Sequence, residues 1–405
     1  MYADAQLPPL QEGRLGDVKH IVVSVSPQTR ASFAAKYGLS PLQVARRFTT
    51  FFTKVLGARA VFDTSFGRDV ALVEGGAEFV ERFRKEQSLP VLASSCPGWI
   101  CYAEKTHGQV LPFISTCKSP MQIMGTLIKE QYGSSIGLTY ARSLLFCNAH
   151  DFARPDKVYH VSVMPCYDKK LEASRDDFFN EAYRTRDVDC VLVSTEVEKM
   201  MADRSTTIHD WSESDLHEEM TKLRRSPTGE VELAGSEGSG AGGALEFVFR
   251  YAAWELFGVK VDQIEYRVGR NPDFRDVELE VDGKVVLRFA AAYGFRNIQN
   301  FVRRVKTNKS PYHYVEVMAC PSACVNGGGQ LRPANSQTLS KADLLEIERI
   351  YSSVPPVSPD VSSDALSNIY RTMGSSPYQG AAIDKFHTRY HAIETANISG
   401  LAVQW

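Results

Sequence analysis

The sequence has 405 residues, of which 43% are hydrophobic and 23% are charged, and its formal net charge is −2. This length can bury the cores of two or three domain-sized units, and the composition is typical of a globular protein. The sequence has no basic stripe for nucleic acid, and apolar runs such as "IVVSVS" are too short to span a membrane. We therefore expect neither nucleic acid nor a membrane as a partner.

The first stretch, residues 1–18, lacks the cationic and apolar layout of a secretion signal and is expected to be a flexible lead-in. The sequence thus predicts a protein of the cytosol, or also of the nucleus, where thiols stay reduced. In that setting the eight cysteines favour metal binding or catalysis over disulfides, at least for those that cluster.

Apolar strand-like runs alternate with helical patterns along the first half of the chain. Ser40 is the expected N-cap of one helix, and Gly133 is the expected end of another. The predicted strands are 20–27, 58–65, 89–94, 157–166 and 187–195, and the predicted helices are 40–57, 76–87, 120–133 and 196–203. This alternation predicts an α/β fold with mainly parallel sheets.

The second half is more varied. Residues 202–235 are polar and expected at the periphery, and "DVELEVDGKVVLRFA" predicts a hairpin that turns at Asp282-Gly283. A strand is predicted to lead into "VMACPSAC". Further helices are predicted at 244–258, 295–306 and 340–351, followed by a Pro/Ser linker at 352–363 and a small helical appendage.

Three cysteine-bearing segments share one layout, in which an apolar strand ends at a Cys and Pro pair. They are "LPVLASSCPGW", "KVYHVSVMPCYDKKLEAS" and "YHYVEVMACPSACVNGGGQ". Ligands of open α/β sheets lie beyond the carboxyl ends of the strands, so convergence of these ends would gather four thiols. The glycines of "NGGGQ" are expected to let the backbone approach an inorganic core. The four cysteines are Cys96, Cys166, Cys320 and Cys324.

Four thiolates suit either an iron–sulfur cluster or zinc. Structural zinc sites usually use two tight cysteine pairs, whereas here only Cys320 and Cys324 are close in sequence. The pattern therefore favours an iron–sulfur cluster. Zinc and four unconnected core cysteines remain the alternatives.

Four segments in order, "SSCPGW", "STCKSPMQIMG", "VMPCYDKKLEASR" and "EVMACPSACVNGGGQ", resemble the signature segments of the iron-only (FeFe) hydrogenase family. The resemblance runs from about residue 20 to 340. "CPGWICYAEKTHG" and "PYHYVEVMACPS" are most similar to its eukaryotic branch, the nuclear prelamin A recognition factor-like proteins, also called cytosolic iron–sulfur assembly component 3. The resemblance implies the fold of the hydrogenase catalytic domain, which has two α/β lobes around a central cleft.

The resemblance also implies that Cys96, Cys166, Cys320 and Cys324 bind a 4Fe–4S cluster. Hydrogenases carry a proton-relay thiol where this chain has Ser95, and glycines where it has Ser322-Ala323, while Lys118 is kept. A serine hydroxyl is a far weaker acid than a thiol. We therefore expect one 4Fe–4S cluster, no catalytic residue and no hydrogen turnover.

The assembly branch carries a second, N-terminal cluster on further cysteines, but this sequence has no cysteine before Cys96. One cluster is therefore expected. In the same branch a terminal Trp docks on the targeting complex, which makes Trp405 the expected partner-binding residue. The alternative for the tail is packing on its own domain.

Other candidates have simpler explanations. Cys101, Cys117, Cys147 and Cys190 lie in apolar contexts and are expected in the core, and His313 is expected to be a structural histidine. Two lysines and a carboxylate after Cys166 either shape the electrostatics of the cluster or start a solvated helix; they are Lys169, Lys170 and Glu172.

The expected organisation is approximate lobes at residues 19–200 and 201–351, then a linker and C-terminal helical segment at 352–405. The expected function is cytosolic iron–sulfur cluster assembly, as a non-enzyme that bridges to the late targeting complex. The alternative is a divergent FeFe hydrogenase or other redox enzyme. Hydrogen evolution from reduced methyl viologen would distinguish the two.

Overall fold

The computed structural model describes residues 19–135, 139–140, 152–269, 271–333, 336, 338–359 and 364–393. The lead-in at 1–18, Cys147 and Trp405 lie outside these residues. No helix among the described residues combines the length and the apolar character that crossing a membrane requires.

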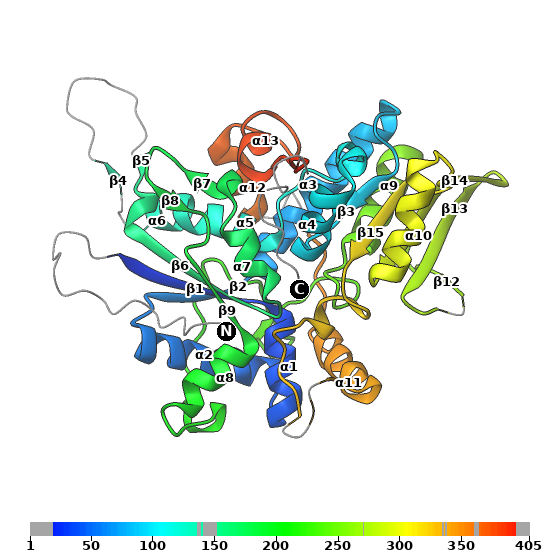
Figure 1. Ribbon diagram of the computed structural model, residues 1–405. Coiled ribbons are helices and arrows are strands. Elements are labelled where there is room, and N and C mark those ends of the chain that lie inside the picture. Colours follow the sequence, from blue (N-terminus) through cyan, green and yellow to red (C-terminus); the bar gives the residue numbers. More distant parts are fainter. Residues whose placement is uncertain are drawn as a thin grey trace, which may run out of the picture.

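The first sheet is fully parallel, with the strand order β2-β1-β6-β9. Its strands are β1 (His20–Val25), β2 (Ala60–Asp63), β6 (Val158–Met164) and β9 (Cys190–Val193). Each matches a run that was predicted from its β-branched residues. In Figure 1 this sheet occupies the left half of the molecule.

Both faces of the first sheet are covered, as parallel sheets require. Along β1, Val23 and Val25 belong to one apolar cluster and Val22 belongs to another, because successive side chains point to opposite faces. The first cluster includes residues from α1 (Pro27–Tyr37), α2 (Pro41–Leu56), α8 (Ser194–Ala202) and α11 (Lys341–Ser352). The second includes residues from α3 (Ser65–Arg84), α5 (Pro120–Leu127), α12 (Asp364–Met373) and α13 (Gly380–Phe386).

The second sheet is mixed, with the order β12-β13-β14-β15-β3. The pairs β12·β13 and β13·β14 are antiparallel, whereas β14·β15 and β15·β3 are parallel. The expected hairpin turn is confirmed, since Asp282 and Gly283 both have positive φ. The strands are β12 (Arg267–Val268), β13 (Phe274–Val281), β14 (Lys284–Tyr293), β15 (Tyr314–Met318) and β3 (Val91–Ala93).

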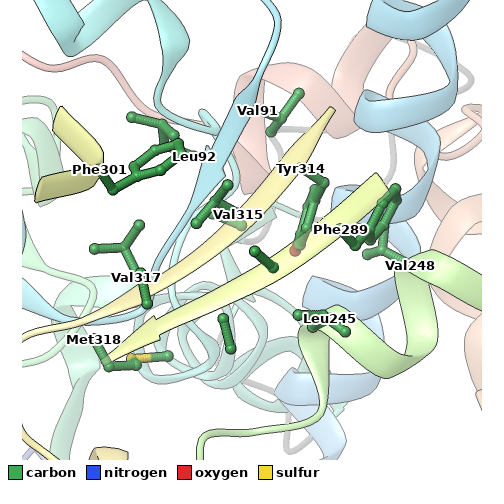
Figure 2. Packing of buried hydrophobic residues seen from close by; sticks show 14 of the residues in the cluster. Val91, Leu92, Leu245, Val248, Phe289, Phe301, Tyr314, Val315, Val317 and Met318 are labelled. Carbon is green, nitrogen blue, oxygen red and sulfur yellow. The ribbon is translucent and has the colours of Figure 1, made fainter. Parts of the chain in front are cut away.

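Figure 2 shows the core of this second lobe. Leu245 and Val248 of α9 (Ala244–Phe257) pack on one face of β14 and β15, and Phe301 of α10 (Phe295–Lys306) lies on the other. Phe289 and Tyr314 stack with their ring centroids 4.8 Å apart. This packing fixes the direction of β15, which leads into Cys320.

Shorter elements complete the described fold. The helical ones are α4 (Pro97–Thr106), α6 (Gly133–Ser135), α7 (Asp168–Ala173), η1 (Gly108–Phe113), η2 (Ile128–Tyr132), η3 (Pro155–Lys157), η4 (Asp176–Phe178), η5 (Ile208–Asp210) and η6 (Ala323–Asn326). The extended ones are β4 (Thr139–Tyr140), β5 (Phe152–Ala153), β7 (Phe179–Asn180), β8 (Thr185–Arg186), β10 (Leu223–Arg225) and β11 (Val231–Leu233).

Two helix boundaries differ from the prediction. Ser40 does cap α2 through a capping box with Gln43. Gly133, however, does not end its helix, because the chain continues through the π-turn η2 into α6. The helix predicted at 76–87 begins at Ser65 and ends at Arg84.

The two sheets exchange segments, so they do not follow the expected division at residue 200. β3 lies within the range 19–200 but pairs with β15 of the second sheet, because its apolar residues complete that core. Conversely, α11 lies within 201–351 but packs through Ile347 and Ile350 on the first sheet. The expectation that the lobes need not be contiguous in sequence describes this arrangement better than the single boundary.

The contact between α5 and the loop before β9 tests this packing. A Cβ at Gly125 would clash with the carbonyl oxygen of Asp187. We predict that Gly125→Ala lowers the free energy of unfolding by about 1–3 kcal/mol, the usual cost of overpacking. Urea denaturation followed by circular dichroism measures it. The control is Gly75→Ala within α3, where a Cβ meets nothing within 4 Å and where about 0.4–1 kcal/mol of stabilisation is expected. Equal stability of the two variants would contradict the packing.

Candidate metal centre

The four candidate cysteines come from three strand ends, as the sequence predicted. Cys96 follows β3 and occupies the N-cap position of α4, with Pro97 in its first turn. Cys166 follows β6 and precedes α7. Cys320 follows β15, and Cys324 lies within η6.

The thiols are close enough to influence one another electrostatically. Burial raises the pKa of Cys166 to about 12, with Asp168 and then the Cys96 and Cys320 thiols adding to the shift. Burial likewise raises the pKa of Cys320 to about 11, with a contribution from Cys96. The pKa of Cys324 is raised by burial and by the other three thiols. The structure therefore places the four sequence-predicted thiols within electrostatic reach of one another.

Backbone contacts hold the three cysteine loops together. The Gly329 N–H donates to the Pro165 carbonyl at 2.9 Å, which links the loop after β15 to the turn before Cys166. A Cβ on Gly98 would lie 2.7 Å from Asp168 Oδ2 and 3.5 Å from the Ala319 Cβ. The loop after β3 thus touches both of the others.

Two of the three glycines of "NGGGQ" lie against the protein itself, and their expected approach to an inorganic core stays a prediction. A Cβ at Gly327 would clash with the Pro165 carbonyl, and one at Gly329 would lie 2.6 Å from the Val193 Cβ. These two glycines therefore allow close approach to the protein's own backbone and core. The Ala319 N–H reaches a candidate thiol and lies 3.4 Å from Cys96 Sγ. The sequence carried no signal for this donor.

The turn between the last two cysteines is left-handed. Ser322 has φ 57° and Ala323 has φ 55°, a region in which non-glycine residues are uncommon. The Ser322 N–H donates to Asp273 Oδ1 at 2.8 Å, and Ala323 is buried. The chain therefore keeps a glycine-like geometry at the two positions where the sequence resemblance leads one to expect glycine.

The charged residues near the thiols are paired rather than solvated. Lys169 and Glu172 are both buried and form an ion pair of 2.5 Å, while Ser119 donates to the same carboxylate. Lys170 pairs with Glu196. Of the two readings of this segment, the solvated one is wrong for Lys169 and Glu172.

The Lys118 ammonium is already paired with other side chains. Its Nζ lies 3.0 Å from Asp187 Oδ2 and 3.3 Å from Thr126 Oγ1. His313 accepts the Arg288 N–H through Nδ1 and is structural, as predicted.

The remaining cysteines are less buried than expected. Cys101, Cys117 and Cys190 are only partly buried. No group of three or more His, Cys, Asp or Glu side chains in the described ranges is arranged to hold a single metal ion. The coupled thiols are therefore not packed around one ion-sized centre.

The donor set fits an iron–sulfur cluster. Clusters are held by cysteine thiolates, and their reduction potentials depend on burial and on hydrogen bonds to sulfur. Here four thiols influence one another electrostatically. Cys96 is buried and accepts a backbone N–H, and the other three cysteines are partly buried. The Lys169 charge also lowers the pKa of Cys96 and Cys324 against the effect of burial, which favours the thiolate form.

The two-sheet α/β fold matches solved structures of FeFe hydrogenases. An apo FeFe-hydrogenase variant from Chlamydomonas reinhardtii matches with a TM-score of 0.74 and 25% identity, covering 92% of this chain and 94% of that one. A structure on stepwise H-cluster assembly in an FeFe-hydrogenase matches with a TM-score of 0.73 and the same identity and coverage.

Residues 19–328 match the family described as iron only hydrogenase large subunit, C-terminal domain, and the chain belongs to this family. Among curated relatives, the cytosolic Fe-S cluster assembly factor narfl of Danio rerio is 48% identical over 96% of this chain and 90% of its own length. The cytosolic iron-sulfur assembly component 3 of Rattus norvegicus is 48% identical over 96% of this chain and 78% of its own length.

One buried histidine on β6 gives a pH test of the strand that leads to Cys166. Burial lowers the pKa of His160 to about 4, and its ring contacts Ser24 Oγ at 2.8 Å and the Asp187 carbonyl at 3.0 Å. An unfolded histidine has a pKa near 6.5, so between about pH 6.5 and pH 4 the unfolded state is protonated at this residue while the folded state is not. The stabilising effect is thus complete above pH 6.5 and is lost as the pH falls towards 4, at up to about 1.4 kcal/mol per pH unit.

We predict that His160→Gln flattens this loss, as measured by urea unfolding at pH 7 and pH 5. The exposed His209 supplies the control variant His209→Gln, which should keep the wild-type slope. An unchanged slope in His160→Gln would show that other groups cause the pH dependence.

Proposed function

We propose that this chain is an iron–sulfur protein of cytosolic iron–sulfur cluster assembly, acting as a binding and bridging protein and not as an enzyme. Its ligands for one 4Fe–4S cluster are Cys96, Cys166, Cys320 and Cys324. The observation that carries the proposal is the mutual electrostatic influence of these four thiols, which come from three separate strand ends. The names of the 48%-identical relatives support the pathway and the cytosolic location.

Bound there, the cluster supplies a one-electron redox centre of soft, thiolate-held iron. The chain's own part is to present the thiols, to exclude water around Cys96, and to give its sulfur the Ala319 N–H. Lys169 adds a positive charge beside thiolates that carry negative charge. These features position and stabilise a bound cluster without requiring any reaction.

The alternative, a divergent hydrogenase, is favoured by the fold likeness alone. Two residues argue against hydrogenase activity. Ser95 stands where a proton-relay thiol is needed, and a hydroxyl gives up its proton far less readily. Lys118 is engaged by the Asp187 carboxylate. The residues therefore favour assembly over hydrogen turnover.

A single substitution tests the cluster. We predict that Cys320→Ala, purified without oxygen, loses most of its iron, its sulfide and its brown chromophore, and melts at a lower temperature because a metal centre contributes folding energy. The wild type should hold about four irons per chain, with an electron paramagnetic resonance signal after reduction. Cys190→Ala is the matched control, since that partly buried thiol lies at the start of β9. Full iron content in Cys320→Ala would refute the assignment.

The C-terminal residue tests the partner. Trp405 lies outside the described residues, and its docking role is proposed from its aromatic side chain, which suits a partner groove. We predict that removing Trp405 weakens pull-down of the late targeting complex severalfold and leaves the iron content unchanged. Replacing the exposed Ile393 by Ala is the control within the same segment. Undiminished pull-down without Trp405 would exclude the docking role.

A further inference from the structure

Two adjoining hollows lie at the strand ends beside the cysteines. Their non-atom space is about 560 and 420 Å³ with open solvent included, of which about 70 and 50 Å³ can hold the centre of a water-sized molecule. The same five residues, Arg68, Ser95, Pro120, Ala241 and Gly242, line both hollows. The smaller one also reaches Cys324. We call these two hollows together the strand-end cavity.

Arg68 is a buried arginine without a carboxylate partner. Its side chain is 4% exposed, and its guanidinium donates to the Tyr351 hydroxyl. The other two buried arginines of the described residues each form an ion pair, Arg30 with Asp63 and Arg82 with Glu78. Arg68 forms none with any described residue, and its Nε has no hydrogen-bond acceptor there.

The carboxylates in the same layer are already used. Asp63 binds Arg30, and Asp69 binds Lys222 at 2.8 Å. Buried charges are normally paired, because an isolated ion loses its hydration without compensation. The cavity, into whose wall Arg68 is built, is the space where a counter-ion can approach it.

The other walls indicate the chemistry of that counter-ion. Ser95 lines both hollows, and its hydroxyl has no hydrogen-bond partner among the described residues, so it offers a second donor. Gly242 has φ +124°, and a Cβ there would lie 3.9 Å from the Arg68 Nε, which leaves open space in front of the guanidinium. Met121 and Met164 add polarisable sulfur to the walls. The walls also carry Lys118 and Lys169, which are paired with Asp187 and Glu172, and the Glu316 carboxylate, which accepts the Tyr293 hydroxyl.

We propose that the strand-end cavity binds a compact, polarisable monoanion of the hydrosulfide or halide class between Arg68 and Ser95. One uncompensated positive charge matches a single negative charge, and two donors suffice for a small acceptor. A doubly charged anion would leave negative charge unbalanced, because the other cations of the walls, Lys118 and Lys169, are already paired. The site lies beside the proposed cluster ligands but does not use their sulfurs.

The test uses the full chain purified without oxygen, with iron content measured on every sample. Melting temperatures are recorded in increasing sodium bromide, against sodium gluconate at equal ionic strength, so that general salt effects cancel. A ligand that binds only the folded state raises the melting temperature with concentration. We expect such a rise in bromide for the wild type, and parallel series in hydrosulfide and formate rank the polarisable anions against a carboxylate.

The variants assign the effect to the cavity. In Arg68→Met the bromide concentration for half the effect should rise at least about tenfold, equivalent to 1.4 kcal/mol, while Arg68→Lys and Ser95→Ala should each weaken binding less. Arg224→Met, which removes an arginine that is paired with Glu232 and lines neither hollow, should bind as the wild type does. Arg68→Lys and Ser95→Ala keep the test open if Arg68→Met does not fold.

Three results would overturn the proposal. The first is no bromide or hydrosulfide effect beyond gluconate in the wild type. The second is undiminished binding in Arg68→Met. The third is formate binding more tightly than both, which would make the site one for carboxylates. Because iron is assayed separately, loss of the cluster and loss of anion binding are distinguishable.

Discussion

The centre of this molecule depends on one close backbone approach. The loop after β15 must pass directly over the turn that precedes Cys166, and it does so with the Gly329 N–H on the Pro165 carbonyl. No side chain fits at Gly327, because its Cβ would lie only 2.3 Å from the oxygen of that same carbonyl. The separation of Cys324 from Cys166 is therefore set by packing of the main chain. A pocket fixed in this way exists before anything binds to it, which lowers the ordering cost of binding.

The two sheets make that approach possible. Parallel strands place their carboxyl ends at one edge, and here β6 of the first sheet and β15 and β3 of the second end facing each other (Figure 1). The helix α3 spans both lobes, since Val70 and Val73 belong to one core and Phe79 to the other. The cysteines are thus held by elements from both halves, and a shift of either sheet would separate them.

The sequence predicted the strands and their terminal cysteines well, because β-branched runs and a following Pro are local signals. It missed the first turns of α3, since Gly67 and the Gly75-Gly76 pair weaken the helical pattern. A Cβ at Gly67 would lie 2.8 Å from the Pro120 carbonyl, so glycine there serves a contact between helices that only the folded chain contains. Arg68 lies in that missed segment, just past the end of β2, and the strand-end rule applied to β2 would have found it.

Other features could not be predicted from the residues in order. The pairing of β3 with β15 joins segments more than two hundred residues apart, and nothing local in "LPVLAS" assigns it to either sheet. The burial of Lys169 with Glu172 likewise depends on Ser119, which arrives from a different element. From the sequence alone, charged residues after a cysteine are equally compatible with the solvated start of a helix, because their partners are brought close only by tertiary structure.

The left-handed turn at Ser322 and Ala323 bears on how far the chain has moved from hydrogenase chemistry. Each non-glycine residue held there costs about 1 kcal/mol or more. The Asp273 carboxylate and the burial of Ala323 offset part of that cost. A chain with no further need of the Cys320 and Cys324 geometry would relax such a turn. The turn without glycine supports the proposal that these two thiols are held for a ligand, and Ser95 together with the Asp187-bound Lys118 supports the part of that proposal that sets hydrogen turnover aside.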